Sequence, residues 1–178
     1  MIYYLETFYL AIANLLLSDE ANELLEANNL PAIKHIDLFN SQYKYEELEI
    51  AYALPAIFIE MAEAGVAEKG RLDESRLETI RIHIEQKQLA STAFNSYNRP
   101  KALESLRLVD AVHLILKGYE GTYWGKMRLV SRELETDHGI NPVHIYTYTS
   151  QFVYDGTDKL RSHSTSTPGA DALNISKS

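Results

Sequence analysis

Two neighbouring apolar segments constrain the fold more than any other feature. LPAIFIEM (residues 54–61) carries no charge before Glu60, a pattern typical of a strand buried on both faces. ETIRIHIEQ (residues 78–86) alternates instead, and successive side chains of a strand point to opposite faces of its sheet. The two faces of this strand carry Ile80, Ile82 and Ile84 on one side and Thr79, Arg81, His83 and Glu85 on the other. We therefore predict a sheet with one face on the core and the other exposed or in an interface.

Helical periodicity marks the N-terminal segment and the segment that begins at Pro100. The first lacks a basic start and contains Glu6, so a buried helix is favoured over a signal peptide or a membrane anchor. The second has proline in its first turn and Gly118 as its stop. The predicted core stripes are Leu5, Phe8, Ile12, Leu15 and Leu16 in the first helix and Leu108, Val109, Val112, Ile115 and Leu116 in the second.

The remaining elements follow from local signals. Ser18 is a predicted N-cap for a helix over residues 19–27, and residues 33–42 form either a short strand or an extended connector. Predicted strands cover residues 126–135 and 143–154. Residues 62–77 are predicted to form a connection, either a hairpin or a long turn, and residues 87–99 a loop. The expected fold is α+β, with a mixed or antiparallel sheet of about four strands packed against an N-terminal helix and one central helix.

Length and composition narrow the class of protein. The 178 residues fit one domain, expected over residues 1–155, and the Ser/Thr-rich segment 156–178 is expected to be a flexible or partner-ordered arm. There are 25 acidic and 17 basic residues, so the net charge of −8 repels nucleic-acid phosphates. The absence of cysteine excludes disulfides, thiolate metal sites and a cysteine nucleophile.

Motifs for catalysis or cofactor binding are missing from the sequence. GYEGTYWGKM fails the spacing of a phosphate loop, and neither G-x-S-x-G nor G-x-G-x-x-G occurs. His83, His113 and His144 would form a metal site only if the sheet and the helix converged. We favour instead a solvent-facing His83 and His144 and a local pair between Asp110 and His113. We therefore predict no catalytic residue, no cofactor and no metal.

Leucines interrupt the polar side of the helix that begins at Pro100, and a partner subunit would cover them. The polar face of the strand over residues 78–86 offers a second surface. The candidate subunit interface therefore comprises Leu103, Leu106, Arg107, Asp110, His113, Leu114, Arg81, His83 and Glu85. Twelve tyrosines add amphipathic surface of the kind enriched at protein contacts. For Tyr146 and Tyr148, simple coverage of one sheet face is an equally good interpretation.

Four short segments stand in a recognisable order along the chain. They are N-S-Q at 40–42, P-A-I-F-I-E at 55–60, I-H-I at 82–84 and L-V-D-A-V-H-L-I-L-K-G at 108–118. With a helix before them and two strands after them, the chain from about residue 5 to residue 155 resembles the tail terminator (tail-completion) proteins of tailed bacteriophages and related prophages.

The resemblance implies a small α+β subunit that assembles with itself as a ring, usually a hexamer, on the last ring of the tail tube protein. Such a ring stops tube polymerisation and offers a docking face to the head-completion or neck protein, and it is not an enzyme. The implied location is the tail neck of the virion, after assembly in the host cytoplasm. DNA would pass through the ring without specific binding, and no membrane partner is implied. The apolar N-terminal segment and residues 156–178 depart from the pattern, and either would serve as an arm across a neighbouring subunit.

Three alternatives stay open. Another head-to-tail joining protein of the neck would share the size, the acidity and the ring assembly, and its position in the particle would separate it. A small α+β enzyme would show a deep pocket with convergent polar side chains. An interaction module unrelated to virions would be a monomer or a dimer without affinity for tube protein.

Overall fold

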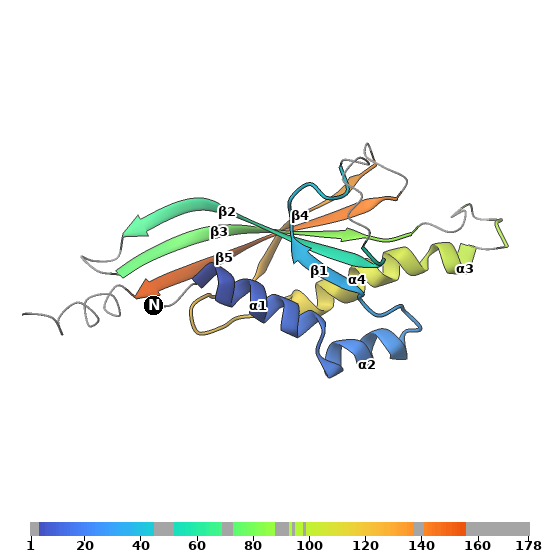
Figure 1. Ribbon diagram of the computed structural model, residues 1–178, viewed down its shortest axis with the longest axis horizontal. Coiled ribbons are helices and arrows are strands. Elements are labelled where there is room, and N and C mark those ends of the chain that lie inside the picture. The colour runs from blue at the N-terminus through green and yellow to red at the C-terminus, as the bar shows by residue number, and fades with distance from the viewer. Residues whose placement is uncertain are drawn as a thin grey trace, which may run out of the picture.

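A twisted sheet with helices on one of its faces organises the chain (Figure 1). The computed structural model describes residues 4–44, 52–68, 73–87, 93, 95–97, 99–136 and 141–155. The elements in chain order are α1 (Tyr4–Leu16), α2 (Asp19–Ala27), β1 (His35–Leu38), β2 (Ala56–Glu68), β3 (Asp73–Glu85), α3 (Arg99–Ala102), α4 (Glu104–Leu116), β4 (Arg128–Glu135) and β5 (Val143–Asp155). This arrangement confirms the predicted α+β class.

The sheet has five strands in the order β1-β2-β3-β5-β4. β1 runs parallel to β2, and all other neighbours are antiparallel. β3 and β5 pair along their whole length, from Asp73 opposite Asp155 to Glu85 opposite Val143. The sheet is therefore mixed, as predicted. The strand beyond the predicted four is β1. For its residues the sequence allowed either a short strand or an extended connector.

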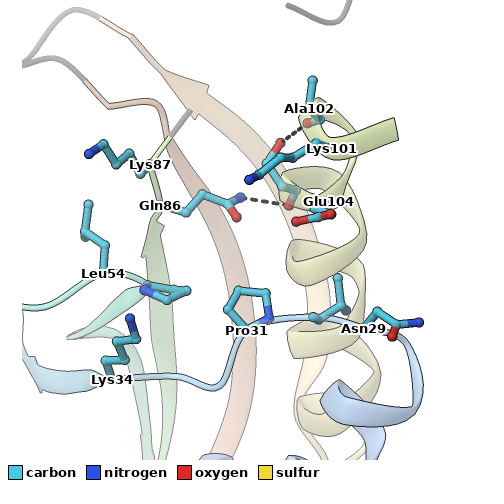
Figure 2. A pocket seen from close by; sticks show the side chains of 12 residues that line it. Asn29, Pro31, Lys34, Leu54, Gln86, Lys87, Lys101, Ala102 and Glu104 are labelled. Carbon is cyan, nitrogen blue, oxygen red and sulfur yellow. Dashed lines mark hydrogen bonds between the residues drawn. The ribbon is translucent and has the colours of Figure 1, made fainter. Parts of the chain in front are cut away.

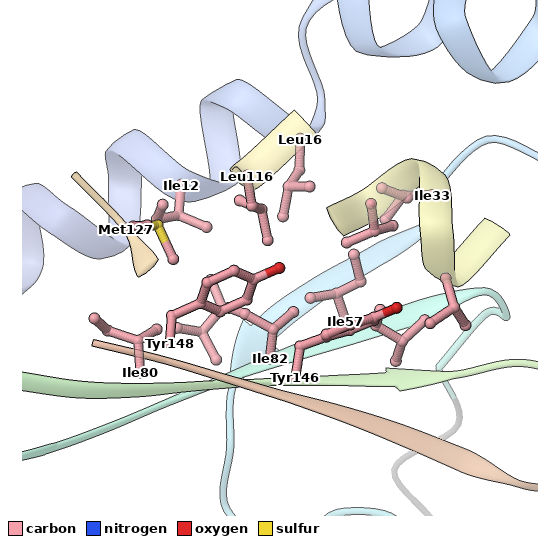
Figure 3. Close-up of a cluster of buried hydrophobic side chains, with 14 of the residues drawn as sticks. Ile12, Leu16, Ile33, Ile57, Ile80, Ile82, Leu116, Met127, Tyr146 and Tyr148 are labelled. Carbon is pink, nitrogen blue, oxygen red and sulfur yellow. The ribbon is translucent and has the colours of Figure 1, made fainter. Parts of the chain in front are cut away.

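The main core lies between the sheet and helices α1 and α4 (Figure 3). Phe8, Ile12 and Leu16 of α1 are fully buried because their spacing of four residues keeps them on one side of the helix. Leu5, the first residue of the predicted stripe, is exposed instead. The sheet and α4 contribute the other large buried side chains, which include Ile80, Ile82, Ile84, Leu108, Val109, Val112, Leu116, Tyr146 and Tyr148.

The hairpin predicted between Ala62 and Leu77 is present, but most of residues 62–77 is strand, and the alternative of a long turn is wrong. β2 continues to Glu68 and β3 already begins at Asp73, so the two form one long antiparallel pair. A register shift between Glu63 and Gly65 marks a β-bulge, which takes up one extra residue without ending the ladder. In the sequence, the glycine and the charged residues of this segment indicate a turn. In the structure Gly65 and Glu63 belong to a strand with a bulge.

The helix expected to run unbroken from Pro100 is divided into α3 and α4 at Leu103. Other helix boundaries agree with the sequence. Ser18 caps α2, since its hydroxyl accepts a hydrogen bond from the Ala21 amide at 3.1 Å. Gly118 follows α4 with φ +74°, a left-handed conformation that glycine adopts without strain.

The glycine-rich segment after α4 is a turn built around Trp124. The indole packs edge-on against Phe8 of α1, with ring centroids 5.1 Å apart, and also contacts Phe152 of β5. A Cβ at Gly121 would lie 2.4 Å from the indole, so this position requires glycine. The turn thereby fastens the N-terminal helix to the last strand.

The sheet face opposite the helices is also partly covered. Tyr43 packs there with Ala56, Phe58, Val143 and Ile145 in a second, smaller core. Phe39, Tyr52 and Leu54 pack against these residues at its margin. The strand over residues 54–61 is therefore buried on both faces, as predicted. The predicted exposed or interface face of the strand over residues 78–86 is wrong at His83 and Glu85, which this second core covers.

None of the described helices is both long and apolar enough to cross a membrane. The proposed arm over residues 156–178 and much of the predicted loop over residues 87–99 lie outside the described residues.

Candidate functional site

The outer side of α3 and α4 carries the exposed leucines that the sequence singled out. Leu106 is 45% exposed and Leu114 is 62% exposed, and Leu103 is exposed beside them. Arg107 and Asp110 lie among these leucines and are also exposed. We call these five residues, Leu103, Leu106, Arg107, Asp110 and Leu114, the leucine flank. Apolar side chains exposed together on one helix face are typical of a contact surface.

His113, predicted as part of the same interface, belongs instead to the contact between α4 and the sheet. Its ring stacks on Tyr146, with centroids 5.4 Å apart, and its Nδ1 lies 2.8 Å from the Tyr148 hydroxyl. Burial lowers the pKa of His113, and Lys117 lowers it further, whereas Asp110 acts in the opposite direction. Tyr146 and Tyr148 therefore cover the sheet face under α4, which is the simpler of their two interpretations.

Asp110 also turns toward the sheet. It accepts a hydrogen bond from the Tyr146 hydroxyl at 3.3 Å, and its carboxylate lies 3.7 Å from the Arg132 guanidinium of β4. In place of the predicted local pair, each residue contacts two side chains of the strands: Asp110 contacts Tyr146 and Arg132, and His113 contacts Tyr146 and Tyr148. The Asp110–Arg132 contact also shows that the leucine flank borders the edge strand β4.

β4 is an edge strand with apolar side chains in the open. Leu129, Val130 and Leu134 are all exposed. Leu129 pairs with Tyr148 and Leu134 pairs with His144, and directly paired residues of antiparallel strands point to the same face. Leu129 and Leu134 therefore face the helix side of the sheet, where they extend the apolar surface of the leucine flank.

The second predicted interface, around Arg81, His83 and Glu85, is largely wrong. Arg81 is exposed, but His83 is only 3% exposed and Glu85 only 6%. Phe39 stacks on the His83 ring at 4.1 Å between centroids, and Tyr52 donates a hydrogen bond to the Glu85 carboxylate. Two of the three residues are thus covered by the chain itself and are not free to meet a neighbouring subunit.

His83 lies at the centre of a chain of polar contacts that we call the His83 cluster. Its Nε2 is 3.0 Å from Glu60, its Nδ1 is 2.7 Å from the Tyr43 hydroxyl, and that hydroxyl donates to Glu135 at 2.9 Å. Lys44 binds the other oxygen of Glu135 at 3.1 Å. Burial lowers the pKa of His83, and contact with Glu60 opposes this effect. For Tyr43, burial and the hydrogen bond to Glu135 raise the hydroxyl pKa.

The His83 cluster has fewer hydrogen-bonding protons than contacts. A neutral His83 brings one ring proton and Tyr43 brings one hydroxyl proton, but three contacts join Glu60, His83, Tyr43 and Glu135. One of the three contacts therefore lacks a hydrogen whenever both carboxylates are ionised and His83 is neutral. Each of the four groups is occupied by another side chain of the same protein, so the cluster acts as a clamp that holds residues 39–44 on the sheet.

The sequence did not single out Tyr43, Lys44, Glu60 or Glu135 for this cluster. They come from three separate segments, and only the sheet order brings them together. The YKY start of the segment after residue 42 was the one local signal, because tyrosine has a large apolar ring and is on average partly buried.

The three histidines considered for a metal lie on opposite faces of the sheet. His83 pairs with Ile145 on the face with the second core, whereas His144 pairs with Ile84 on the helix side, where His113 also lies. Among the described residues, no group of three or more histidine, aspartate or glutamate side chains is arranged to hold a metal ion.

A hollow of about 750 Å³ lies between the end of α2, the start of β2 and helix α3 (Figure 2). Leu30, Pro31 and Ala102 give it an apolar floor, and Gln86 is occupied by a hydrogen bond to the Ser105 carbonyl at 2.7 Å. The charged residues that line the hollow are Lys34, Lys87, Lys101 and Glu104. Three ammonium groups around an apolar floor favour an anionic group of a partner over acid–base chemistry.

Comparison with solved structures gives distant structural likenesses. A solved structure described as "Virion of native gene transfer agent (GTA) particle" is similar to this chain with a TM-score of 0.43 and 10% sequence identity. The likeness covers 80% of this chain and 92% of that chain. No known protein family matches the sequence. No curated protein matches it either.

Proposed function

We propose that this chain is a structural virion protein that assembles with itself as a ring and terminates the tail tube of a tailed phage or a related particle. The ring, six-membered in the proteins that the sequence resembles, would also offer a docking face to the head-completion or neck protein. The observation that carries the proposal is the leucine flank together with the apolar edge strand β4. This surface has no cover from the rest of the described chain.

The polar side chains support a structural role over catalysis. His83, Tyr43, Glu60 and Glu135 contact one another, and His113 is held by the two tyrosines of β5. Glu60, His83 and Glu135 line a hollow of about 420 Å³, but each of them is already in contact with another side chain of the same protein. These contacts fasten one element of the fold to another, which favours a structural role over acid–base chemistry. We therefore propose that the protein is not an enzyme.

The acidic excess suits a ring through which DNA passes. At a net charge of −8, a bore lined by part of the carboxylates repels phosphates, so DNA would slide through without specific binding. A ring structure with a basic bore would contradict this part of the proposal.

Negative-stain imaging of the purified protein, alone and mixed with the tube protein of the same particle, tests the assignment. We expect rings alone and rings at one end of each tube in the mixture. Bare tube ends, with the protein dispersed in the background, would reject the role as a terminator.

Leu106→Glu tests the leucine flank. Because Leu106 is already half in solvent, the variant should keep its fold by circular dichroism while its sedimentation changes from rings to monomers. Leu77→Glu is the matched control, since Leu77 of β3 is also 45% exposed but lies outside the flank. Rings of normal size from Leu106→Glu would show that the flank is not a subunit contact.

A further inference from the structure

We propose that the outer face of the N-terminal helices α1 and α2 of one copy docks on the leucine flank and on β4 of the next copy, head to tail. This inference rests on the proposed self-assembly but not on the position in the particle. It supplies the second subunit surface that the buried His83 and Glu85 cannot provide.

The outer face of α1 and α2 is apolar in its middle and acidic around it. Leu10 is 48% exposed and Leu17 is 49% exposed, and both lie opposite the buried side of α1. They are seven residues apart, about two helical turns, so they form one ridge. All charged residues between positions 4 and 33 are exposed carboxylates, namely Glu6, Asp19, Glu20, Glu23 and Glu26.

The segment that carries the leucine flank has the opposite charge. β4 itself is balanced, with Arg128 and Arg132 against Glu133 and Glu135, but the two glutamates pair with Ile145 and Val143 on the face of the second core, whereas Arg132 pairs with Tyr146 on the helix side. Residues 99–132 contain seven basic side chains, Arg99, Lys101, Arg107, Lys117, Lys126, Arg128 and Arg132, against three acidic ones, Glu104, Asp110 and Glu120. Asp110 is already paired with Arg132. Leu106 and Leu114 of α4 and Leu129 of β4 are exposed within this segment, and Leu134 of β4 is exposed just after it. Both surfaces thus have exposed leucines with charged residues near them. The charged residues are acidic on one surface and mainly basic on the other.

The two surfaces also lie on different sides of α4. α1 and α2 pack against one side of α4, while its other side, with Leu106 and Asp110, borders β4. A copy that binds one neighbour through the outer face of α1 and α2 can therefore still bind a second neighbour through its leucine flank. Such heterologous contacts propagate from copy to copy and close into a ring when the rotation allows it.

A symmetric contact between two flanks is the main competitor, and charge disfavours it. Two flanks face to face would bring together two copies of the same basic-rich segment, residues 99–132. Like charges opposed across an interface weaken it, whereas the acidic ridge on the basic flank brings opposite charges together. The second copy is therefore expected to present α1 and α2.

Two variants, each damaged on one surface only, test the arrangement. The ridge variant carries Leu10→Lys and Leu17→Lys, and the flank variant carries Leu106→Glu and Leu114→Glu. Each alone should be a folded monomer, because every head-to-tail contact needs both surfaces. Their equimolar mixture should give dimers and nothing larger, since one intact ridge then meets one intact flank. A variant with Leu77→Lys should assemble like the unmodified protein.

Sedimentation velocity, with circular dichroism as the fold control, measures these outcomes. Normal assembly of the ridge variant, or monomers in the mixture, would overturn the inference. The salt dependence gives a second readout: the dissociation constant should rise by roughly tenfold between about 50 mM and about 500 mM NaCl, because screening weakens exposed charge pairs. Insensitivity to salt would contradict the charge argument.

The experiment also separates this inference from the proposed function. If the unmodified protein assembles and the variants complement each other, but tube ends stay bare, the docking arrangement stands and the terminator role fails. If the unmodified protein is monomeric at high concentration, both fail.

Discussion

Replacing Tyr43 by phenylalanine measures how strongly one hydroxyl holds residues 39–44 on the sheet. The hydroxyl lies 2.7 Å from His83 Nδ1 and donates to Glu135 at 2.9 Å. The ring itself packs against Phe39 and Phe58, and phenylalanine keeps that packing. The substitution therefore removes the two polar contacts of the hydroxyl and little apolar contact.

The expected cost follows from what each partner loses. His83 is 3% exposed, so its Nδ1 is left without a partner and without water, which costs about 1–3 kcal/mol. Glu135 keeps Lys44 and adds less than about 1 kcal/mol. A total near 2 kcal/mol corresponds to a Tm lower by about 4–8 °C for a domain of this size.

Urea unfolding and a thermal scan by circular dichroism give the free energy of unfolding and the Tm. Tyr97→Phe is the control, since Tyr97 is 97% exposed and should change neither value. A loss below about 0.5 kcal/mol for Tyr43→Phe would mean that the cluster does not hold this segment.

Three further predictions concern the core and the His83 cluster. Val112→Asp should unfold the chain, because an unpaired carboxylate at this fully buried position costs about 3–5 kcal/mol, and a cooperative unfolding transition near that of the unmodified protein would contradict the assigned core side of α4. Glu135→Gln should leave stability at neutral pH unchanged or raise it, since the amide supplies the missing hydrogen to Tyr43 while the Lys44 pair is lost; a drop above about 1 kcal/mol in urea would refute the proton count. Because burial lowers the pKa of His83, the unfolded chain takes up the proton first on acidification, so the stabilising effect of the neutral ring is present above about pH 6.5 and is lost as the pH falls through the lowered pKa. Urea midpoints that rise from about pH 7.5 to about pH 5.5 would have the wrong sign.

Local patterns predicted the elements with strong signals. The stripe of Phe8, Ile12 and Leu16, the cap at Ser18 and the stop at Gly118 all depend on residues within one or two turns of each other. The α+β class then follows from the order of helices and strands. These signals lie within a few neighbouring residues, so they can be recognised in the sequence without knowledge of the fold.

Features that depend on distant partners could not be read in this way. Alternation over residues 78–86 placed Arg81, His83 and Glu85 on one face, but it could not show that Phe39 and Tyr52 cover most of that face. The leucines at 106 and 114 were located on the right side of α4 from periodicity alone. Their continuation onto β4 depends on the pairing of β4 with β5, which no local pattern contains.

The strand order also determines when the sheet can be completed. β5 is the last strand in the chain, yet it lies between β3 and β4, so until residues 143–155 have been synthesised β3 has one unpaired edge and β4 has no neighbour. Pairings across such long sequence separations form slowly. During translation the growing chain therefore exposes the edge of β3 and both edges of β4 to other nascent copies, and the final strand pairs with β3 and with one edge of β4.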